Sequence, residues 1–274
     1  MNKRILITGG VGFLGQLLIE SIYNEYSYIR VTSRNEEKLN ILKSKFPNIS
    51  IVCGDLLNTN FVNQITNDID LIYHLAGYKY VSLSEKNVSE SINGNIITTN
   101  NILESISKSL SKVEIRIIST NKVHNIKGVY AATKFLSEKL ALSYQKKFSN
   151  ISLKIIYLTN IFNSPGSITE LWKESIINNT ELKVTDLKCT RFFLTKKSAV
   201  ELIKNASVSF PIKSLVLEDL LKAIIFKYNG EYDLKKIKIT GLSPSENLHE
   251  LHSDKKLWSN NSNYYSNEEL ISII

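Results

Sequence analysis

The chain has 274 residues, of which 43% are hydrophobic and 22% charged, a balance typical of a globular protein with room for a full core. Its net charge of +8 comes from scattered lysines without interleaved aromatic residues, so we expect a small anionic ligand and no nucleic acid. No stretch is long enough to span a bilayer and no signal peptide is visible, so we expect a cytoplasmic protein without a membrane partner. Cys53 and Cys189 are expected to be buried free thiols, and no metal site is predicted.

The N-terminal segment predicts a dinucleotide-binding turn. Residues 4–8 form a short apolar strand, and apolar positions at helical spacing follow from residue 13 to residue 22. The glycines between them fit G-x-G-x-x-G at Gly10, Gly12 and Gly15, and Gly9 adds an overlapping spacing. In this setting the backbone can approach a pyrophosphate at a helix N-terminus. The residues expected to hold the cofactor here are Gly9, Gly12, Phe13, Leu14 and Gly15.

The next two strands suggest which dinucleotide is bound. The second strand, residues 28–32, ends in Ser33-Arg34, where an NAD site usually carries an acid. A hydroxyl and a guanidinium suit a 2′-phosphate, so NADP is preferred over NAD, unless Arg34 simply faces solvent. The third strand, residues 49–53, is followed by Asp55 and Leu56. Both are assigned to the cofactor site, although Asp55 could equally cap the following helix.

Residues 70–77 read as a fourth strand that ends in the small residues Ala76 and Gly77. Small side chains let the backbone pass close to a cofactor, so both are assigned to the cofactor site. His74 lies within the apolar part of this strand and is interpreted as a core histidine with satisfied hydrogen bonds.

The rest of the first half alternates helices with strands. A long helix is expected over residues 89–107, a strand over 113–118, a helix through Tyr130 and Lys134 to residue 144, and a strand over 152–158. This alternation predicts an α/β fold, a Rossmann-like doubly wound parallel sheet. The NADP-binding domain is expected to cover residues 1–158.

After residue 158 the alternation weakens, which predicts a small C-terminal substrate-binding lid. Helices are expected over residues 171–178, 196–206 and 215–228, with a small helix at the end of the chain. Short strands are expected over 182–184 and 237–240, and irregular structure over 186–191. The lid is assigned to residues 159–190 and 215–274, with 191–214 returning to the cofactor domain.

The polar end of the fifth strand carries the candidate chemistry. It reads Ser119-Thr120-Asn121-Lys122, and Tyr130 and Lys134 follow on one face of the next helix. An ammonium group and a positive nicotinamide ring both favour the phenolate, so Tyr130 could take a proton from a substrate hydroxyl while hydride leaves. Ser119 or Thr120 could hydrogen-bond the same oxygen. Together with the glycine turn, this predicts alcohol oxidation with a nicotinamide cofactor.

These motifs resemble the extended short-chain dehydrogenase/reductases, and within them the inverting UDP-N-acetylglucosamine 4,6-dehydratases of polysaccharide biosynthesis. The resemblance covers nearly the whole chain. It rests on Thr8 to Gly15, Ser33-Arg34, Gly54-Asp55, Ser119 to Lys139, Asn160 with Pro165 to Ile168, Thr185-Asp186 with Thr190 to Phe192, and Gly241 to Glu250.

The resemblance implies a role for each of these positions. Tyr130 would remove the proton of the 4-hydroxyl, Thr120 would assist at the same oxygen, and Lys134 would bind the cofactor ribose. Lys122 would be the base at carbon 5 of the sugar. The positions expected to bind the UDP-amino-sugar substrate are Lys79, Asn160, Arg191 and Glu246. A homo-oligomer is also implied.

Asn121 departs from the family pattern, which has Thr-Asp-Lys where this chain has Thr120-Asn121-Lys122. The aspartic acid protonates the departing 6-hydroxyl, and an amide cannot do so. Two further hypotheses therefore stay open. The first is a UDP-N-acetylhexosamine 4-epimerase or 4-keto reductase, which needs chemistry at carbon 4 alone. The second is a non-catalytic protein that binds NADP or a nucleotide sugar.

Overall fold

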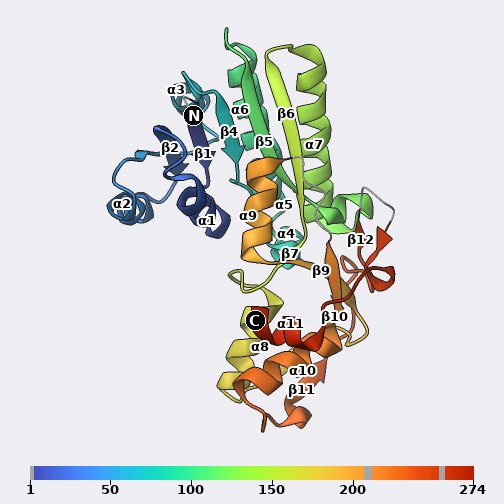
Figure 1. The fold of residues 1–274 in the computed structure, drawn as a ribbon. Helices are drawn as coiled ribbons and strands as arrows, with labels where there is room; N and C mark the ends of the chain where they lie inside the picture. The colour runs from blue at the N-terminus through green and yellow to red at the C-terminus, as the bar shows by residue number, and fades with distance from the viewer. Residues whose placement is uncertain (1–2, 207–211, 253–256) are drawn as a thin grey trace. The chain divides into compact units, whose positions relative to one another are not determined.

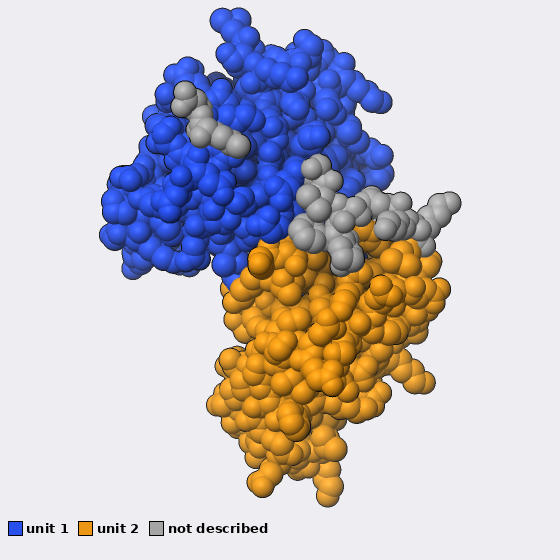
Figure 2. All heavy atoms as spheres, viewed as in Figure 1, with its two compact units in different colours: residues 1–123, 128–157, 200–208 blue, residues 124–127, 158–199, 209–274 orange. Residues whose placement is uncertain are grey.

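The computed structural model describes residues 3–206, 212–252 and 257–274. The chain divides into two compact units (Figure 2). Unit 1 comprises residues 1–123, 128–157 and 200–208, and unit 2 comprises residues 124–127, 158–199 and 209–274. Of the segment 191–214, which the sequence assigned to the cofactor domain, residues 200–206 belong to unit 1, residues 191–199 and 212–214 belong to unit 2, and residues 207–211 lie outside the described part of the chain.

Unit 1 is built on a six-stranded sheet with the order β3-β2-β1-β4-β5-β6 (Figure 1). Strands β1 to β5 pair in parallel, and β6 extends the sheet beside β5. This order confirms the Rossmann-like doubly wound fold. The strands are β1 (Arg4–Thr8), β2 (Tyr28–Ser33), β3 (Ser50–Cys53), β4 (Leu71–His74), β5 (Val113–Thr120) and β6 (Ile151–Leu158).

Helices of unit 1 cover the sheet, and α7 runs along β5 and β6 (Figure 1). The expected long helix over 89–107 contains a π-helical turn, η1, that separates α5 from α6. The helical elements are α1 (Phe13–Ile22), α2 (Glu36–Lys45), α3 (Thr59–Thr66), α4 (Val81–Ser84), α5 (Val88–Ile92), η1 (Asn93–Ile97), α6 (Thr98–Ser107), η2 (Asn121–His124) and α7 (Gly128–Lys147). Helix α9 (Lys196–Asn205) begins in unit 2 and ends in unit 1.

The core of unit 1 forms because its central strands are apolar on both faces, as expected for strands covered by helices on each side. Ile5, Leu6 and Ile7 in β1 and Leu71 and Ile72 in β4 are fully buried. Their burial supplies the hydrophobic free energy that holds the sheet to its helices, about 25 cal/mol for each Å² of apolar surface removed from water. The ends of β1, β4 and β5 are thereby fixed relative to one another.

The described residues of unit 2 form three small sheets. In the first, β9 (Thr190–Leu194) pairs antiparallel with β10 (Lys213–Val216) and parallel with β7 (Asn160–Ile161). The others pair β8 (Leu182–Val184) with β11 (Ile237–Ile239), and β12 (Leu251–His252) with β13 (Leu257–Trp258). The remaining elements are α8 (Ile168–Ile177), α10 (Leu217–Tyr228), η3 (Leu234–Lys236), η4 (Ser259–Asn261) and α11 (Asn267–Ile273).

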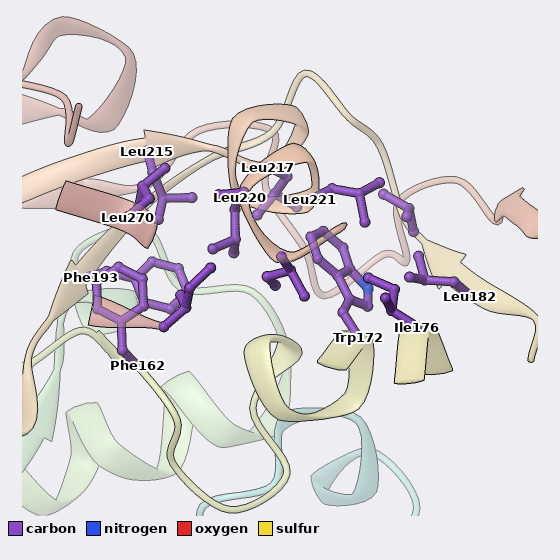
Figure 3. Packing of buried hydrophobic residues seen from close by; sticks show 14 of the residues in the cluster. Phe162, Trp172, Ile176, Leu182, Phe193, Leu215, Leu217, Leu220, Leu221 and Leu270 are labelled. Atoms are coloured by element: carbon purple, nitrogen blue, oxygen red, sulfur yellow. The ribbon is translucent and has the colours of Figure 1, made fainter. Parts of the chain in front are cut away.

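Helices α8, α10 and α11 close a separate hydrophobic core in unit 2 (Figure 3). Trp172 of α8 lies among the leucines of α10, and its indole N–H donates to the Lys183 carbonyl at 3.0 Å. Phe162 and Phe193 pack with their ring centroids 4.5 Å apart. This unit has its own core and is therefore more than a loop-like lid.

The structure corrects two expectations, one about the strands of unit 2 and one about the cysteines. Strands β9 and β10 were not predicted, because residues 186–191 read as irregular and 215–228 as helix. Cys53 is an exposed thiol because it ends the edge strand β3, whereas Cys189 is buried as expected. In the described part of the chain, no helix is long and apolar enough to cross a membrane.

Candidate functional site

The candidate site of unit 1 lies where the order of the sheet reverses, at the carboxyl ends of β1 and β4. These strands are neighbours, with Thr8 opposite His74, while the chain connects β1 to β2 on the other side. Loops that leave two such strands diverge and create the crevice in which open α/β sheets bind ligands. The glycine turn follows β1, and Ala76 and Gly77 follow β4.

Two glycines shape the turn for a ligand. Gly9 has a φ of +69°, and a Cβ there would meet the backbone nitrogen of Ala76 at 2.8 Å. Gly12 has an extended backbone and is the N-cap of α1 without a side-chain cap. A Cβ on Gly12 would approach only the Gly9 carbonyl oxygen, at 3.1 Å. Packing therefore does not require glycine at position 12, whereas a ligand at the helix N-terminus does.

The other glycines of the turn serve packing. A Cβ on Gly15 would lie 2.5 Å from the backbone of Gly10, and one on Gly10 would lie 2.2 Å from the Val31 side chain. Helix α1 can therefore pack closely on β1 and β2. The N–H groups of Gly9 and Gly10 donate to the Thr32 carbonyl at 3.0 and 3.4 Å, which fixes the turn on the end of β2.

A positively charged side chain, that of Arg34, follows the end of β2. Arg34 is 74% exposed and lies 3.9 Å from the Asp55 carboxylate, a solvated pair that holds the guanidinium only weakly. Asp55 accepts from the Leu57 N–H at 3.0 Å, whereas the N-cap of α3 is Asn58. The helix-cap interpretation of Asp55 is therefore wrong, and its role at the cofactor remains a prediction. Because this ion pair is weak, the Arg34 side chain can reorient toward a phosphate at little cost in free energy.

The end of β4 brings Gly77 close to Lys134 of helix α7. A Cβ on Gly77 would lie 2.9 Å from the Asn95 side-chain oxygen and 3.3 Å from the Lys134 amine nitrogen. Glycine is therefore needed for Lys134 to approach this loop. Leu56 is buried in the core and its carbonyl accepts from Asn101 at 2.9 Å, so its backbone supports the same region of the sheet edge.

Asn95 is a structural residue of the site that the sequence interpretation missed. It lies in the π-helical turn η1, buried, and its side-chain oxygen accepts from the Tyr78 N–H at 2.8 Å. Its amide donates to the Tyr78 carbonyl at 3.1 Å and to the Thr133 hydroxyl at 3.0 Å. Asn95 thus joins the loop after β4 to helix α7. Gly94 in mid-helix was the available signal, since helix interiors disfavour glycine.

Thr120, Tyr130 and Lys134 come together at the end of β5. The Thr120 hydroxyl hydrogen-bonds the phenol of Tyr130, whereas the Ser119 hydroxyl donates to the Glu138 carboxylate. Lys134 donates to the Ile118 carbonyl at 2.9 Å. Burial raises the pKa of Tyr130 to about 12, against the effect of the Thr120 hydrogen bond. Burial lowers the pKa of Lys134 to about 8, and the charge of Glu138 opposes that shift.

These pKa shifts limit what the site can do alone. A phenol with a pKa of about 12 is protonated at neutral pH and is a poor base. A positive charge brought next to the ring would lower its pKa. The pair is therefore arranged for proton transfer that depends on a cationic cofactor, which a nicotinamide ring in its oxidised state supplies.

His74 is confirmed as a satisfied core histidine. Its two ring nitrogens lie 2.8 Å from the Thr8 hydroxyl and 3.1 Å from the Thr99 hydroxyl. Burial, and then the positive charge of Lys134, lower the pKa of His74 to about 3. The ring is neutral at physiological pH and contributes no charge to the site.

Asn121 begins the short helix η2 and is 2% exposed. Its side-chain oxygen accepts from the Thr120 hydroxyl at 3.3 Å. Within the described residues its amide nitrogen has no hydrogen-bond partner. An unsatisfied buried donor costs about 1–3 kcal/mol, so this nitrogen is expected to meet an acceptor on a ligand. Lys122 follows it and is partly buried.

The substrate-binding residues expected in unit 2 are tied into a polar network. Arg191 donates to the carbonyls of Thr190 and Leu248, both at 2.9 Å, and its Nε lies 4.0 Å from the Glu250 carboxylate. The Asn160 amide donates to Glu250 at 3.2 Å. Glu250, which sequence reasoning did not single out, also accepts from the Phe192 N–H at 3.0 Å. These contacts use much of the donor capacity of Arg191.

Of the two other expected substrate residues, Lys79 is exposed and Glu246 is half-buried. Lys79 in unit 1 is exposed, with its amine 5.2 Å from the Tyr80 ring centroid. Glu246 in unit 2 accepts from the Ser243 N–H at 3.1 Å, and its carbonyl accepts from Lys127 at 3.1 Å. The residues expected to bind the cofactor and to act in catalysis therefore belong to unit 1, and Asn160, Arg191 and Glu246 belong to unit 2.

Comparisons with known proteins identify a matching family and similar proteins. Residues 5–268 match a family described as "Polysaccharide biosynthesis protein". A Methanocaldococcus jannaschii protein named "Uncharacterized membrane protein MJ1061" is 31% identical over 91% of this chain and 80% of its own. The inverting UDP-N-acetylglucosamine 4,6-dehydratase of Campylobacter jejuni is 28% identical over 97% of this chain and 82% of its own.

A solved structure agrees with this relationship. The X-ray structure of Pen from Bacillus thuringiensis superimposes with a TM-score of 0.89 and 27% identity, over 100% of this chain and 97% of that one. The fold is the one that the sequence resemblance implied. The chain belongs to the polysaccharide biosynthesis protein family, whose model matches nearly all of its length.

Proposed function

We propose that this protein is an NADP-dependent enzyme that modifies a UDP-amino sugar, and specifically an inverting UDP-N-acetylglucosamine 4,6-dehydratase. The observation that carries the proposal is the Thr120–Tyr130–Lys134 arrangement at the end of β5, in the unit that also holds the glycine turn. The C. jejuni relative, which is named for this reaction, aligns over nearly the whole chain.

At carbon 4 of the sugar, Tyr130 takes the proton of the hydroxyl and Thr120 holds its phenol in place. A bound nicotinamide supplies hydride transfer to and from the sugar. Lys134 binds the nicotinamide ribose, and its ammonium group favours the phenolate of Tyr130. General base catalysis of this kind contributes a factor of roughly 10²–10⁴ in rate.

At carbon 5, Lys122 is the base. Oxidation of carbon 4 acidifies the neighbouring hydrogen, so an amine can remove it. The buried amide of Asn121 donates a hydrogen bond to the sugar, which satisfies its unpartnered nitrogen. It cannot protonate the departing 6-hydroxyl, so the proton for this step must come from solvent or another group, and we expect slow elimination.

The cofactor is NADP, which is held by the residues that follow β1 and by those that follow β2. The first turn of α1, with Phe13 and Leu14, faces the pyrophosphate beside Gly12, where a side chain would intrude. The exposed guanidinium of Arg34 and the hydroxyl of Ser33 bind the 2′-phosphate. The weak pairing of Arg34 with Asp55 supports this assignment.

The two units have different roles in this proposal, cofactor binding and substrate binding. Unit 1 is the cofactor domain, and Lys79 on its surface contacts substrate. Unit 2 is the substrate-binding part, in which Asn160, Arg191 and Glu246 bind the nucleotide sugar. The remaining capacity of Arg191 for a phosphate is limited by its bonds to Thr190 and Leu248.

A second candidate is favoured by Asn121 alone. A 4-epimerase or 4-keto reductase needs Tyr130, Lys134 and the cofactor, but no acid at carbon 6. The neutral amide at position 121 is compatible with such chemistry and is a handicap for dehydration.

The mass of the product separates these candidates. The protein is incubated with NADP⁺ and UDP-N-acetylglucosamine, in wild-type form and as Asn121→Asp. Loss of one water supports the dehydratase, and we expect the aspartate variant to lose water faster. An isomer of unchanged mass would identify an epimerase. Turnover only of a 4-keto sugar with NADPH would identify a reductase.

A further inference from the structure

Helix α7 carries a buried carboxylate that the proposed reaction does not use. Glu138 is 5% exposed and lies four residues after Lys134, on the same face of the helix. Buried carboxylates are rare unless they are paired or hydrogen-bonded. The contacts of Glu138 therefore show what holds it there.

Two consecutive residues of β5 form hydrogen bonds with Lys134 and Glu138 of α7. The Ile118 carbonyl accepts from the Lys134 amine at 2.9 Å. The next residue, Ser119, donates its hydroxyl to the Glu138 carboxylate. On β6, the Tyr157 phenol donates to the other carboxylate oxygen at 3.2 Å. Glu138 is therefore hydrogen-bonded to residues of both β5 and β6. Its partner on β5, Ser119, directly precedes Thr120.

The charged and titratable surroundings of this pair are few. On α7, Lys134 is flanked by Tyr130 and Glu138, and Glu138 also faces Lys139. From β4, the group that faces Lys134 is His74, which is neutral. From β5 and β6 come only the neutral donors Ser119 and Tyr157. In the described part of the chain, Glu138 is therefore the negative charge that acts on Lys134.

We propose that Glu138 is a positioning residue that keeps Lys134 in its ammonium form and fixes the end of β5 through Ser119. The proposal rests on the proposed function, in which the Lys134 ammonium group supports ionisation of Tyr130. Glu138 is assigned its role through Lys134 and Ser119 and not through a contact with substrate or cofactor.

The direction of the pH effect follows from the charges. Burial holds the pKa of Lys134 at about 8, and the anion of Glu138 opposes a further fall. Burial raises the pKa of Glu138 itself, and the hydrogen bonds from Ser119 and Tyr157 oppose that rise and favour the anion. Removal of that anion lowers the pKa of Lys134, by about one pH unit for a neighbouring opposite charge. Lys134 then loses its proton at a lower pH, and the basic limb of the pH–rate profile moves to lower pH.

The test measures Lys134 directly in the full chain without substrate. The rate at which acetic anhydride modifies Lys134 is followed against pH by peptide mass spectrometry, because only the neutral amine reacts. In Glu138→Gln, which keeps the size and hydrogen-bonding capacity of the side chain, we expect the midpoint to fall by about one pH unit. Glu138→Asp, which keeps the charge, is expected to restore most of the shift.

A matched control uses the exposed Glu104–Lys108 pair of α6, which has the same four-residue spacing. Glu104→Gln should leave the midpoint of Lys134 unchanged. If Glu138→Gln does not fold, the Ser119→Ala/Tyr157→Phe double variant replaces it. It removes two donors to the carboxylate and leaves more of it neutral, so the midpoint should fall by a smaller amount.

A folded variant of either kind with the wild-type midpoint for Lys134 would overturn the proposal. The labelling needs no sugar, so a midpoint that shifts in a protein without activity on UDP-N-acetylglucosamine would contradict the proposed function and leave the coupling of Glu138 to Lys134 standing.

Discussion

Substitution of Gly12 by alanine should separate cofactor binding from folding. The extended backbone of Gly12, with φ at −72° and ψ at 168°, is open to any residue. The added methyl group would meet only the Gly9 carbonyl oxygen, at 3.1 Å, which requires a shift of a few tenths of an ångström. It would, however, occupy the space in which a pyrophosphate approaches the helix N-terminus.

The expected effect on stability is small. Alanine is a poorer N-cap than glycine by about 0.5–1 kcal/mol, and the loss of glycine's freedom in the unfolded chain returns about 0.4–1 kcal/mol. The free energy of unfolding should therefore change by less than about 1 kcal/mol, a shift in Tm of at most about 2–4 °C. NADP⁺ affinity should fall at least tenfold, which corresponds to about 1.4 kcal/mol.

Calorimetric titration with NADP⁺ and thermal unfolding measure the two effects. Gly230→Ala is the matched control, because nothing lies within 4 Å of its added Cβ, and both quantities should stay at wild-type values. Gly15→Ala should lose stability as well as affinity, since its methyl group would meet the Gly10 backbone at 2.5 Å. Wild-type NADP⁺ affinity in Gly12→Ala would refute the placement of the pyrophosphate.

Three further predictions concern single side chains. Arg34→Ala should weaken NADP⁺ binding about tenfold or more and leave NAD⁺ binding unchanged, as measured by titration with each; equal losses for both would contradict a 2′-phosphate site. Tyr130→Phe should reduce kcat by roughly 10²–10⁴ at an unchanged Tm, as measured by turnover of UDP-N-acetylglucosamine. The folded-state pKa of His74, about 3, lies below its unfolded value of about 6.5, so the unfolded state binds the extra proton. Stability should therefore fall as the pH drops from about 6.5 toward 3, at about 1.4 kcal/mol per pH unit from this residue. Denaturant unfolding of His74→Asn should lack that part of the slope, and an identical slope would show that His74 is charged in the fold.

The sequence predicted most of unit 1 because its signals are local. The run Arg4–Thr8 and the glycines after it are typical of one kind of strand, turn and helix, and β1 and α1 begin and end where expected. The same is true of the i, i+4 pair Tyr130 and Lys134, because helical spacing alone puts them on one face.

Features that depend on distant partners could not be read from the chain. Strand β9 forms because Thr190–Leu194 pairs with residues 213–216 and 160–161, and segments this short are too brief to show a strand period in the sequence. Asn95 acquires its role from Tyr78 and Thr133, and Glu138 from Ser119 and Tyr157. Only the three-dimensional structure shows which polar side chains are buried together.

Asn121 shows how sequence and structure complement each other. The resemblance to dehydratases marked it as a departure from an expected acid. The structure adds that its amide nitrogen is buried without a hydrogen-bond partner among the described residues. An amide at this position donates hydrogen bonds but cannot supply a proton.

The reaction in D₂O tests the central claim most directly. Protein, NADP⁺ and UDP-N-acetylglucosamine are incubated in D₂O, exchangeable deuterons are washed out, and the product mass is measured for the wild type and for Tyr130→Phe. Inverting dehydration removes the hydrogen on carbon 5 and replaces it from solvent. We predict a wild-type product that has lost one water and gained one carbon-bound deuterium, with almost none from Tyr130→Phe. An unchanged sugar, or equal yields from both proteins, would contradict the account.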